Sequence, residues 1–223
     1  MKGLQLNNLS CHYRGHVLFK ELSAHFAPGL IALSGVNGSG KSTLLRVLAG
    51  INQPQQGDVL FDGLSLYQSH PKAKIGYLPY LPSLYPHLTV EENIVWLKRL
   101  QQCQAPYTQA MTFMREYEIS HFKNKLFAKL SDGQKKWIHL LVSMMHSPKL
   151  LILDEPCSSL DPKQRQNLWA LLKSWQMPDR VILFSTHHVS EIASVANEIV
   201  FLQEGQLYFD KSTVVLPKEV PCL

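Results

Sequence analysis

The chain has 223 residues, and 22 Lys and Arg against 17 Asp and Glu give it a formal net charge of +5. A chain of this length buries about 70% of its unfolded surface, so its core needs neither disulfides nor a metal. Hydrophobic residues make up 45% of the sequence and are spread along it, which excludes disordered, collagen-like and low-complexity proteins. The charge suits an anionic ligand, an anionic membrane surface or nucleic acid, and does not decide among them.

Apolar stretches such as residues 138–145 stop far short of the roughly 20 residues needed to cross a bilayer. The N-terminus also lacks the pattern of a secretory signal. We therefore expect a cytoplasmic chain that does not cross a membrane. The cysteines form neither a CxxC pair nor a metal-ligand spacing, and we expect reduced thiols at Cys11, Cys103, Cys157 and Cys222.

The first third of the chain has the alternating pattern of strands, interrupted by turn signals at Arg14-Gly15 and Pro28-Gly29. After Gly40 the apolar spacing becomes helical until Gly50. The pattern thus predicts one helix over 42–49 and strands over 4–13, 17–26, 30–35, 58–61 and 74–78.

Residues 89–147 have an almost purely helical pattern, and Thr89 begins a capping box with Glu92. From Leu150 onward strands and helices alternate, which predicts parallel strands joined by crossover helices, with ligands at the carboxyl ends of the strands. The helical stretch is therefore an insertion into an α/β sheet. The predicted helices are 90–102, 107–118, 132–147, 162–175 and 188–196, and the predicted later strands are LLILDEP, VILFST and EIVFLQ.

Residues 35–42 fit the pattern G-x-x-x-x-G-K-[ST] between a predicted strand and a predicted helix. The glycines let backbone N–H groups point at phosphate oxygens, and the helix N-terminus adds its positive dipole end. Lys41 would neutralise β- and γ-phosphate charge, and Ser42 would offer its hydroxyl to Mg²⁺. The alternative is a glycine-rich turn. The predicted nucleotide-binding residues here are Gly35, Val36, Asn37, Gly38, Ser39, Gly40, Lys41, Ser42 and Thr43.

Residues 150–156 form an apolar strand that ends in two acids. Such a strand places its carboxylates at the ligand edge of the sheet, where Asp154 can hold Mg²⁺ and Glu155 can polarise an attacking water. The alternative is an acidic cap on the following helix.

Residues 130–134, with the sequence LSDGQ, begin the helix predicted over 132–147. Ser131 and Gln134 form a capping box, so helix initiation alone explains them. The functional alternative is that the same helix N-terminus binds a γ-phosphate through Ser131 and the N–H of Gly133.

Together these motifs resemble those of the ATP-binding cassette (ABC) ATPases over essentially the whole chain. In that family a Walker A loop, an LSGGQ-like signature, a Walker B strand, a D-loop and a switch histidine follow one another. Here they are residues 35–42, LSDGQ, the strand ending at Asp154-Glu155, Ser159-Leu160-Asp161, and Ser185-Thr186-His187. The resemblance implies a single ABC ATPase domain over 1–223. It is an α/β P-loop fold with an N-terminal antiparallel β portion and a helical subdomain at about 80–147.

The resemblance also assigns roles that spacing alone does not. It implies ATP and Mg²⁺ as cofactors, Glu155 and His187 as catalytic residues, and Ser42 and Asp154 as metal ligands. His187 is preferred over His188 because it directly follows Ser-Thr. Further nucleotide contacts implied by the resemblance are Tyr13, Ser131, Gly133, Gln134 and Asp161. Tyr13 would stack on adenine, although a tyrosine at a strand end can simply pack.

The sequence departs from the family pattern in three places. Tyr80 stands where the family has its Q-loop glutamine, and Asp132 replaces the first signature glycine. At roughly 8 Å from a phosphate, an inward-facing Asp132 would cost about 2 kcal/mol per unit charge pair. Residues 135–137, Lys-Lys-Trp, occupy the place of an arginine-containing run. These departures leave turnover and coupling open.

The resemblance implies an ATP-hydrolysing subunit of an export-type ABC transporter, on the cytoplasmic face of a membrane. Two copies, or this chain and a homologue, would close head-to-tail around two ATP molecules and act on separate transmembrane permease subunits. One alternative is a non-transport ABC ATPase acting on nucleic acid or the ribosome. Another is a degenerate cassette that barely hydrolyses ATP. We expect no direct nucleic-acid contact and a solvated face for the lysines at 123, 125, 129, 135 and 136.

Overall fold

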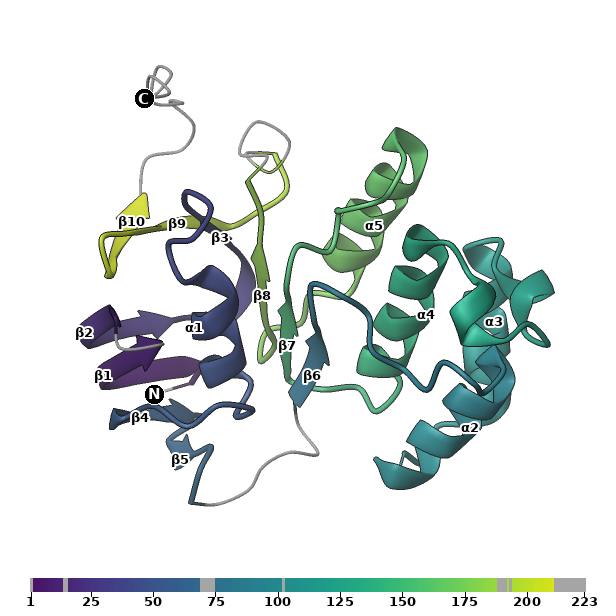
Figure 1. Cartoon of the computed structure of the whole chain (residues 1–223), viewed down its shortest axis with the longest axis horizontal. Helices are drawn as coiled ribbons and strands as arrows, with labels where there is room; N and C mark the ends of the chain where they lie inside the picture. The colour runs from purple at the N-terminus through teal and green to yellow at the C-terminus, as the bar shows by residue number, and fades with distance from the viewer. Residues whose placement is uncertain are drawn as a thin grey trace.

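Two sheets form the left half of the molecule in Figure 1. The computed structural model describes residues 2–13, 16–68, 75–101, 103–187, 192 and 194–210. The smaller sheet is antiparallel and has the order β2-β1-β4-β5. It confirms the predicted N-terminal antiparallel portion. Its strands are β1 (Leu4–Tyr13), β2 (His16–Phe26), β4 (Gln56–Phe61) and β5 (Leu64–Ser65).

The larger sheet has the order β10-β9-β3-β8-β7-β6, and all its pairs are parallel except β10 with β9. Its carboxyl ends therefore meet along one edge, as the alternating pattern predicted. The strands are β3 (Gly29–Ser34), β6 (Ile75–Leu78), β7 (Leu150–Leu153), β8 (Val181–Ser185), β9 (Glu198–Gln203) and β10 (Gln206–Asp210).

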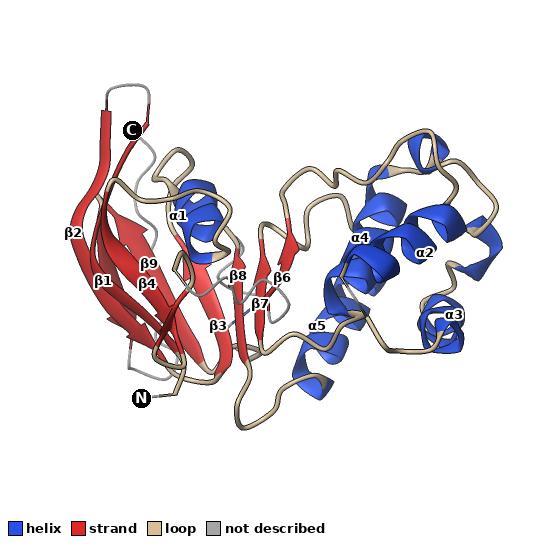
Figure 2. Ribbon diagram, turned by 90° about the horizontal axis from the view of Figure 1, so that it is seen from below, coloured by secondary structure: helices blue, strands red, loops and turns tan. Residues whose placement is uncertain are grey.

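Helix α1 (Lys41–Leu48) packs between the two sheets, as Figures 1 and 2 show. Its buried leucines share one core with β1, β2 and the near face of β3. The other face of the larger sheet is covered by α4 and α5, beyond which the remaining helices lie (Figure 2). The α/β cassette fold with both sheets is thus as predicted.

The remaining helices are α2 (Val90–Leu100), α3 (Tyr107–Glu116), α4 (Asp132–Met144) and α5 (Pro162–Ser174), with 3₁₀ turns at Ser120–Phe122 and Phe127–Lys129. Helices α2 to α4 lie between β6 and β7 in the chain, although these two strands pair directly. Trp137 of α4 stacks on Tyr117 with ring centroids 4.5 Å apart, which ties α4 to the end of α3. Within the described residues, no helix is long and apolar enough to cross a membrane.

Five of the six predicted helices are confirmed, and each of the five ends one to three residues earlier than predicted. For example, α4 ends at Met144 because Ser147 adopts a φ of 49° and Pro148 follows. Strands β5 and β10 were not predicted. The predicted turn at Arg14-Gly15 and most of the predicted helix over 188–196 lie outside the described residues.

Candidate nucleotide-binding site

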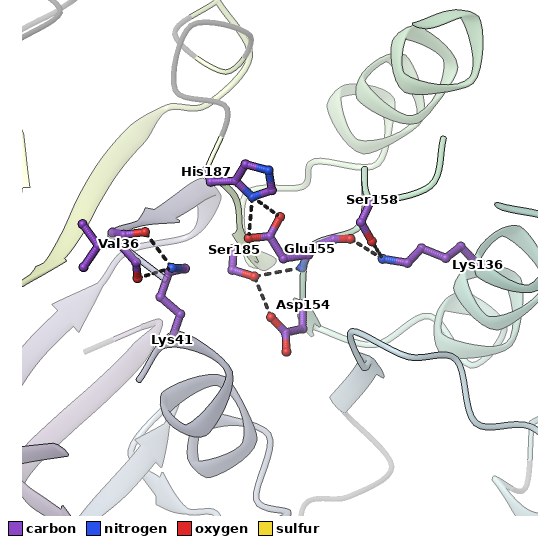
Figure 3. A network of polar contacts seen from close by, with 9 residues as sticks. Val36, Lys41, Lys136, Asp154, Glu155, Ser158, Ser185 and His187 are labelled. Carbon is purple, nitrogen blue, oxygen red and sulfur yellow. Dashed lines mark hydrogen bonds and ion pairs between the residues drawn. The ribbon is translucent and has the colours of Figure 1, made fainter. Parts of the chain in front are cut away.

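The glycine-rich loop lies between β3 and α1, as its pattern requires. Gly40 is the N-cap of α1 and has a φ of 97°, a left-handed conformation that disfavours any side chain. It offers no side chain to the first N–H groups of the helix, so these groups are left for an anion. The ammonium of Lys41 donates hydrogen bonds to the carbonyl oxygens of Gly35, at 2.6 Å, and Val36, at 2.9 Å (Figure 3). The Lys41 side chain therefore reaches back from the start of α1 to the first two residues of the loop.

Two acidic residues follow the buried strand β7. Asp154 is 1% exposed, and its Oδ1 accepts a hydrogen bond of 2.7 Å from the hydroxyl of Ser185, at the end of β8. The same hydroxyl accepts a bond of 2.8 Å from the N–H of Glu155. Ser185 thus joins the ends of the two strands and fixes both acids, as Figure 3 shows.

Glu155 and His187 point toward each other across the carboxyl ends of β7 and β8 (Figure 3). The Nδ1 atom of His187 is 3.1 Å from each carboxylate oxygen of Glu155. The Glu155 side chain is only 12% exposed, whereas that of His187 is 50% exposed. The histidine thus contacts the carboxylate and leaves half of its own side chain open to solvent.

A cleft of about 510 Å³ gathers the loop, Glu155 and His187 in one place. Burial lowers the pKa of Lys41, while the carboxylates of Glu155 and Asp154 act in the opposite direction. The cleft thus combines an ammonium, a helix N-terminus and an oriented carboxylate, which are the groups needed to bind and hydrolyse a polyphosphate. It is lined by Leu18, Asn37, Gly38, Gly40, Lys41, Ser42, Thr43, Tyr80, Glu155 and His187.

The oxygen donors at this edge fit Mg²⁺. Ser42 is exposed in the cleft, and the carboxylate of Asp154 lies buried at the neighbouring strand end. The described residues contain no group of three or more His, Cys, Asp and Glu that could enclose a metal alone. Mg²⁺ commonly uses one or two protein oxygens and takes its other ligands from water and phosphate. Ser42 and Asp154 are the residues that would hold it.

The signature residues do not line this cleft. Ser131 caps α4, because its hydroxyl accepts the Gln134 N–H at 3.3 Å and the Gln134 side chain accepts the Ser131 N–H at 3.0 Å. Asp161 caps α5 by accepting the N–H of Gln164 at 2.8 Å. Gly133 packs so closely on Ser159 that an added Cβ would lie 2.8 Å from its carbonyl oxygen. Within one chain, these residues and the cleft remain separate.

The acidic departure in the signature faces solvent. The side chain of Asp132 is 74% exposed and pairs with Lys135 at 3.4 Å. It therefore adds no charge to this chain's own cleft.

Lys136 corrects one expectation from the sequence. The sequence predicts a solvated position for it, but its side chain is 3% exposed, and its ammonium donates hydrogen bonds to the carbonyl oxygen of Glu155 and the hydroxyl of Ser158. It lies on the inner side of α4, where the apolar stripe passes through residues 137 and 138. Tyr80 lines the cleft, and its ring centroid is 5.4 Å from the same ammonium.

Other predicted residues are only partly placed. Tyr13 ends β1, but its side chain lies outside the described residues, so stacking on adenine stays a prediction. The hydroxyl of Ser39 is buried in the loop without a hydrogen-bond partner among the described residues.

Sequence reasoning missed Ser185 and Lys136 as site residues. The sequence indicates Ser185 only as the first residue of the switch motif, without a role, and Lys136 only as part of a run that departs from the family pattern.

Comparison with known proteins adds the decisive observation. The model of a family described as "ABC transporter" matches residues 19–158. The chain belongs to this family. The matched residues include the glycine-rich loop, the signature and both acids, so this member of the family is an ATP-binding cassette of the P-loop ATPase type.

Individual relatives and solved structures agree with this assignment. An uncharacterized ABC transporter ATP-binding protein of Bacillus subtilis (strain 168) is 31% identical over 92% of this chain and 69% of its own length. A spermidine/putrescine import ATP-binding protein of Spiroplasma citri is 30% identical over 92% of this chain and 60% of its own length. A solved ATP-binding subunit of an ABC transporter superposes with a TM-score of 0.84, at 24% identity over 92% of this chain and 88% of that one. The last comparison shows the shared fold.

Proposed function

We propose that this chain binds Mg-ATP and hydrolyses it as the motor subunit of an ABC transporter. The observation that carries the proposal is the single cleft in which Lys41, Glu155 and His187 meet the N-terminus of α1. The loop and Lys41 would hold the β- and γ-phosphates. Ser42 and Asp154 would hold Mg²⁺, which would neutralise phosphate charge.

Glu155 is the proposed general base. Its carboxylate would accept a proton from the attacking water while the water oxygen bonds to the γ-phosphorus and the bond to the ADP oxygen breaks. His187, at 3.1 Å from both oxygens of that carboxylate, would orient it and contact the γ-phosphate. General bases held in this way contribute about 10²- to 10⁴-fold to a rate.

The test is Glu155→Gln, which preserves size and removes the basic carboxylate. We expect Mg-ATP affinity within about twofold of wild type and a fall in kcat of about 100-fold or more. Steady-state hydrolysis and equilibrium titration measure the two effects. Glu116→Gln, on the exposed end of α3, is the matched control and should hydrolyse like wild type. Wild-type turnover in Glu155→Gln would remove Glu155 from the mechanism.

A second cassette is part of the proposal, because the signature residues lie outside the cleft of their own chain. Ser131, Gly133 and Gln134 at the start of α4, together with Asp161, would complete the site of a second copy or of a homologue. Transmembrane permease subunits would receive the resulting motion at the cytoplasmic face of a membrane. No contact with nucleic acid is proposed.

Export is the proposed direction of transport, on the resemblance of the stretch from Leu81 to Leu100 to export-type subunits. Import is the competing direction, because the Spiroplasma citri relative is named for import. Co-purification with the permease and reconstitution in vesicles, with ATP supplied on the cassette side, distinguish the two. Loss of substrate from the cassette side supports export, and accumulation there overturns it.

A further inference from the structure

We propose that Lys136 is a positioning residue for Glu155, which holds the backbone of the general base from the side opposite the nucleotide. The inference rests on the proposed function, because it assumes that Glu155 acts on water. It concerns a residue of α4 that does not line the cleft.

The backbone of Glu155 needs such support. Its φ of 48° lies in the left-handed region, which a residue with a side chain adopts at a cost of about 1–3 kcal/mol. Such a conformation persists only where the surroundings determine it. At Glu155 it directs the carboxylate toward His187 and the cleft.

Four contacts determine this conformation, and they come from the end of β8, from the loop after β7 and from α4. The N–H of Glu155 donates to Ser185 at 2.8 Å, and its carboxylate meets His187 at 3.1 Å. Its carbonyl oxygen accepts from the Ser158 N–H at 3.1 Å and from the ammonium of Lys136. Lys136 is the one charged group in this set that comes from the helical insertion, and Figure 3 shows it reaching Glu155 from that side.

The ammonium of Lys136 is itself held in place. One hydrogen bond goes to the Glu155 carbonyl and one to the hydroxyl of Ser158, while the Tyr80 ring lies 5.4 Å away. The side chain is only 3% exposed, and a buried ammonium is stable only where such groups replace its hydration. Burial lowers the pKa of Lys136 to about 8, against the opposing effect of the Glu155 and Asp154 carboxylates.

This arrangement separates positioning from binding. Lys136 contacts the general base through its carbonyl oxygen, whereas the nucleotide would contact Lys41 and the loop on the other side. A displacement of Glu155 by a fraction of an ångström would impair the transfer of a proton from water while leaving the phosphate contacts intact. A lysine that served only to fill the core would affect stability and leave kcat unchanged.

The experiment compares Lys136→Met with Lys173→Met, which replaces an exposed lysine of α5. Methionine has a similar length and fills the same space without donating hydrogen bonds. For Lys136→Met we expect kcat to fall about tenfold or more, with KM for Mg-ATP within about twofold of wild type. Lys173→Met should match wild type in both. A wild-type kcat in folded Lys136→Met overturns the proposal.

Ser158→Ala keeps the proposal testable if Lys136→Met does not fold. This variant retains the lysine and removes one acceptor that fixes it, so kcat should fall about threefold at unchanged KM, as expected for one hydrogen bond. An unchanged kcat would then overturn the proposal. Glu155→Gln distinguishes failure of the proposed function from failure of the role of Lys136, because wild-type turnover in that variant would contradict the proposed function itself. If Glu155→Gln is inactive and folded Lys136→Met is fully active, only the role of Lys136 is lost.

Discussion

The cleft and the signature edge differ in how their polar groups are satisfied. In the cleft, groups from separate elements hold one another: Ser185 of β8 bonds to both acids after β7, and Lys41 spans the loop before α1. At the signature edge, the cap bonds are local: the side chains of Ser131 and Gln134 each bond to the other residue's N–H, and the Asp161 side chain bonds to Gln164 three residues away. The groups of the cleft are therefore held by several elements of one chain, whereas the signature edge consists of two helix starts that are each capped by their own residues.

The largest expected effect is a loss of nucleotide affinity when the cleft is altered at Lys41. Lys41→Ala removes the ammonium that is proposed to hold the β- and γ-phosphates, and also its two hydrogen bonds to the loop carbonyls. We expect Mg-ATP affinity to fall about 100-fold or more, equivalent to about 2.7 kcal/mol, in equilibrium titration. Lys173→Met is the control. Wild-type affinity in Lys41→Ala would show that the loop does not bind the phosphates.

The next effect concerns the buried side of the signature helix. His139 of α4 is 9% exposed, and its Nδ1 accepts from the N–H of Ser83 at 3.3 Å. Burial, with the neighbouring charge of Lys136, lowers the pKa of His139 to about 4. In the unfolded chain His139 therefore binds a proton near pH 6.5, whereas in the folded chain it binds that proton only near pH 4.

The contribution of His139 to the free energy of unfolding should accordingly be fully present above about pH 6.5 and be lost as the pH falls toward 4. Between about pH 7.5 and pH 5 the His139 contribution to the free energy of unfolding should decrease by about 2 kcal/mol. Urea unfolding of wild type and His139→Gln at both pH values measures it, because glutamine does not titrate. Equal pH dependence in the two proteins would show that His139 does not titrate as its burial requires.

Much of this arrangement could be predicted from the sequence, because its signals are local. The glycine-rich pattern, the apolar strand before Asp154 and Glu155, and the capping boxes each depend on neighbouring residues, and the structure places all of them on the expected elements. Lys136 and Ser185 could not be recognised in this way. Their partners lie 19 and 31 residues away, and only packing decides that Lys136 faces inward while its neighbour Lys135 pairs with Asp132.

The smallest expected effect tests two of the departures from the family pattern, Tyr80 and Asp132. Asp132 faces solvent, so its removal should change the turnover of the isolated chain little. The ring of Tyr80 lies beside the ammonium of Lys136, and this contact is not with Glu155 or His187. We expect Tyr80→Gln with Asp132→Gly to change kcat by less than about tenfold, or 1.4 kcal/mol, in steady-state hydrolysis at saturating Mg-ATP. A larger rise would show that these two residues limit turnover in the native chain.

The central claim is that one chain supplies the phosphate-binding loop, Glu155 and His187, and that the signature of a second copy completes the site. It is tested most directly by comparing Glu155→Gln with the same variant carrying Ser131→Arg, in sedimentation at increasing Mg-ATP. Glu155→Gln should dimerise when ATP is bound. The double variant should bind ATP within about twofold as tightly and remain monomeric, because Ser131 lies outside the cleft and only the signature edge is altered. A double variant that still dimerises, or a Glu155→Gln protein that stays monomeric at saturating Mg-ATP, would contradict the account.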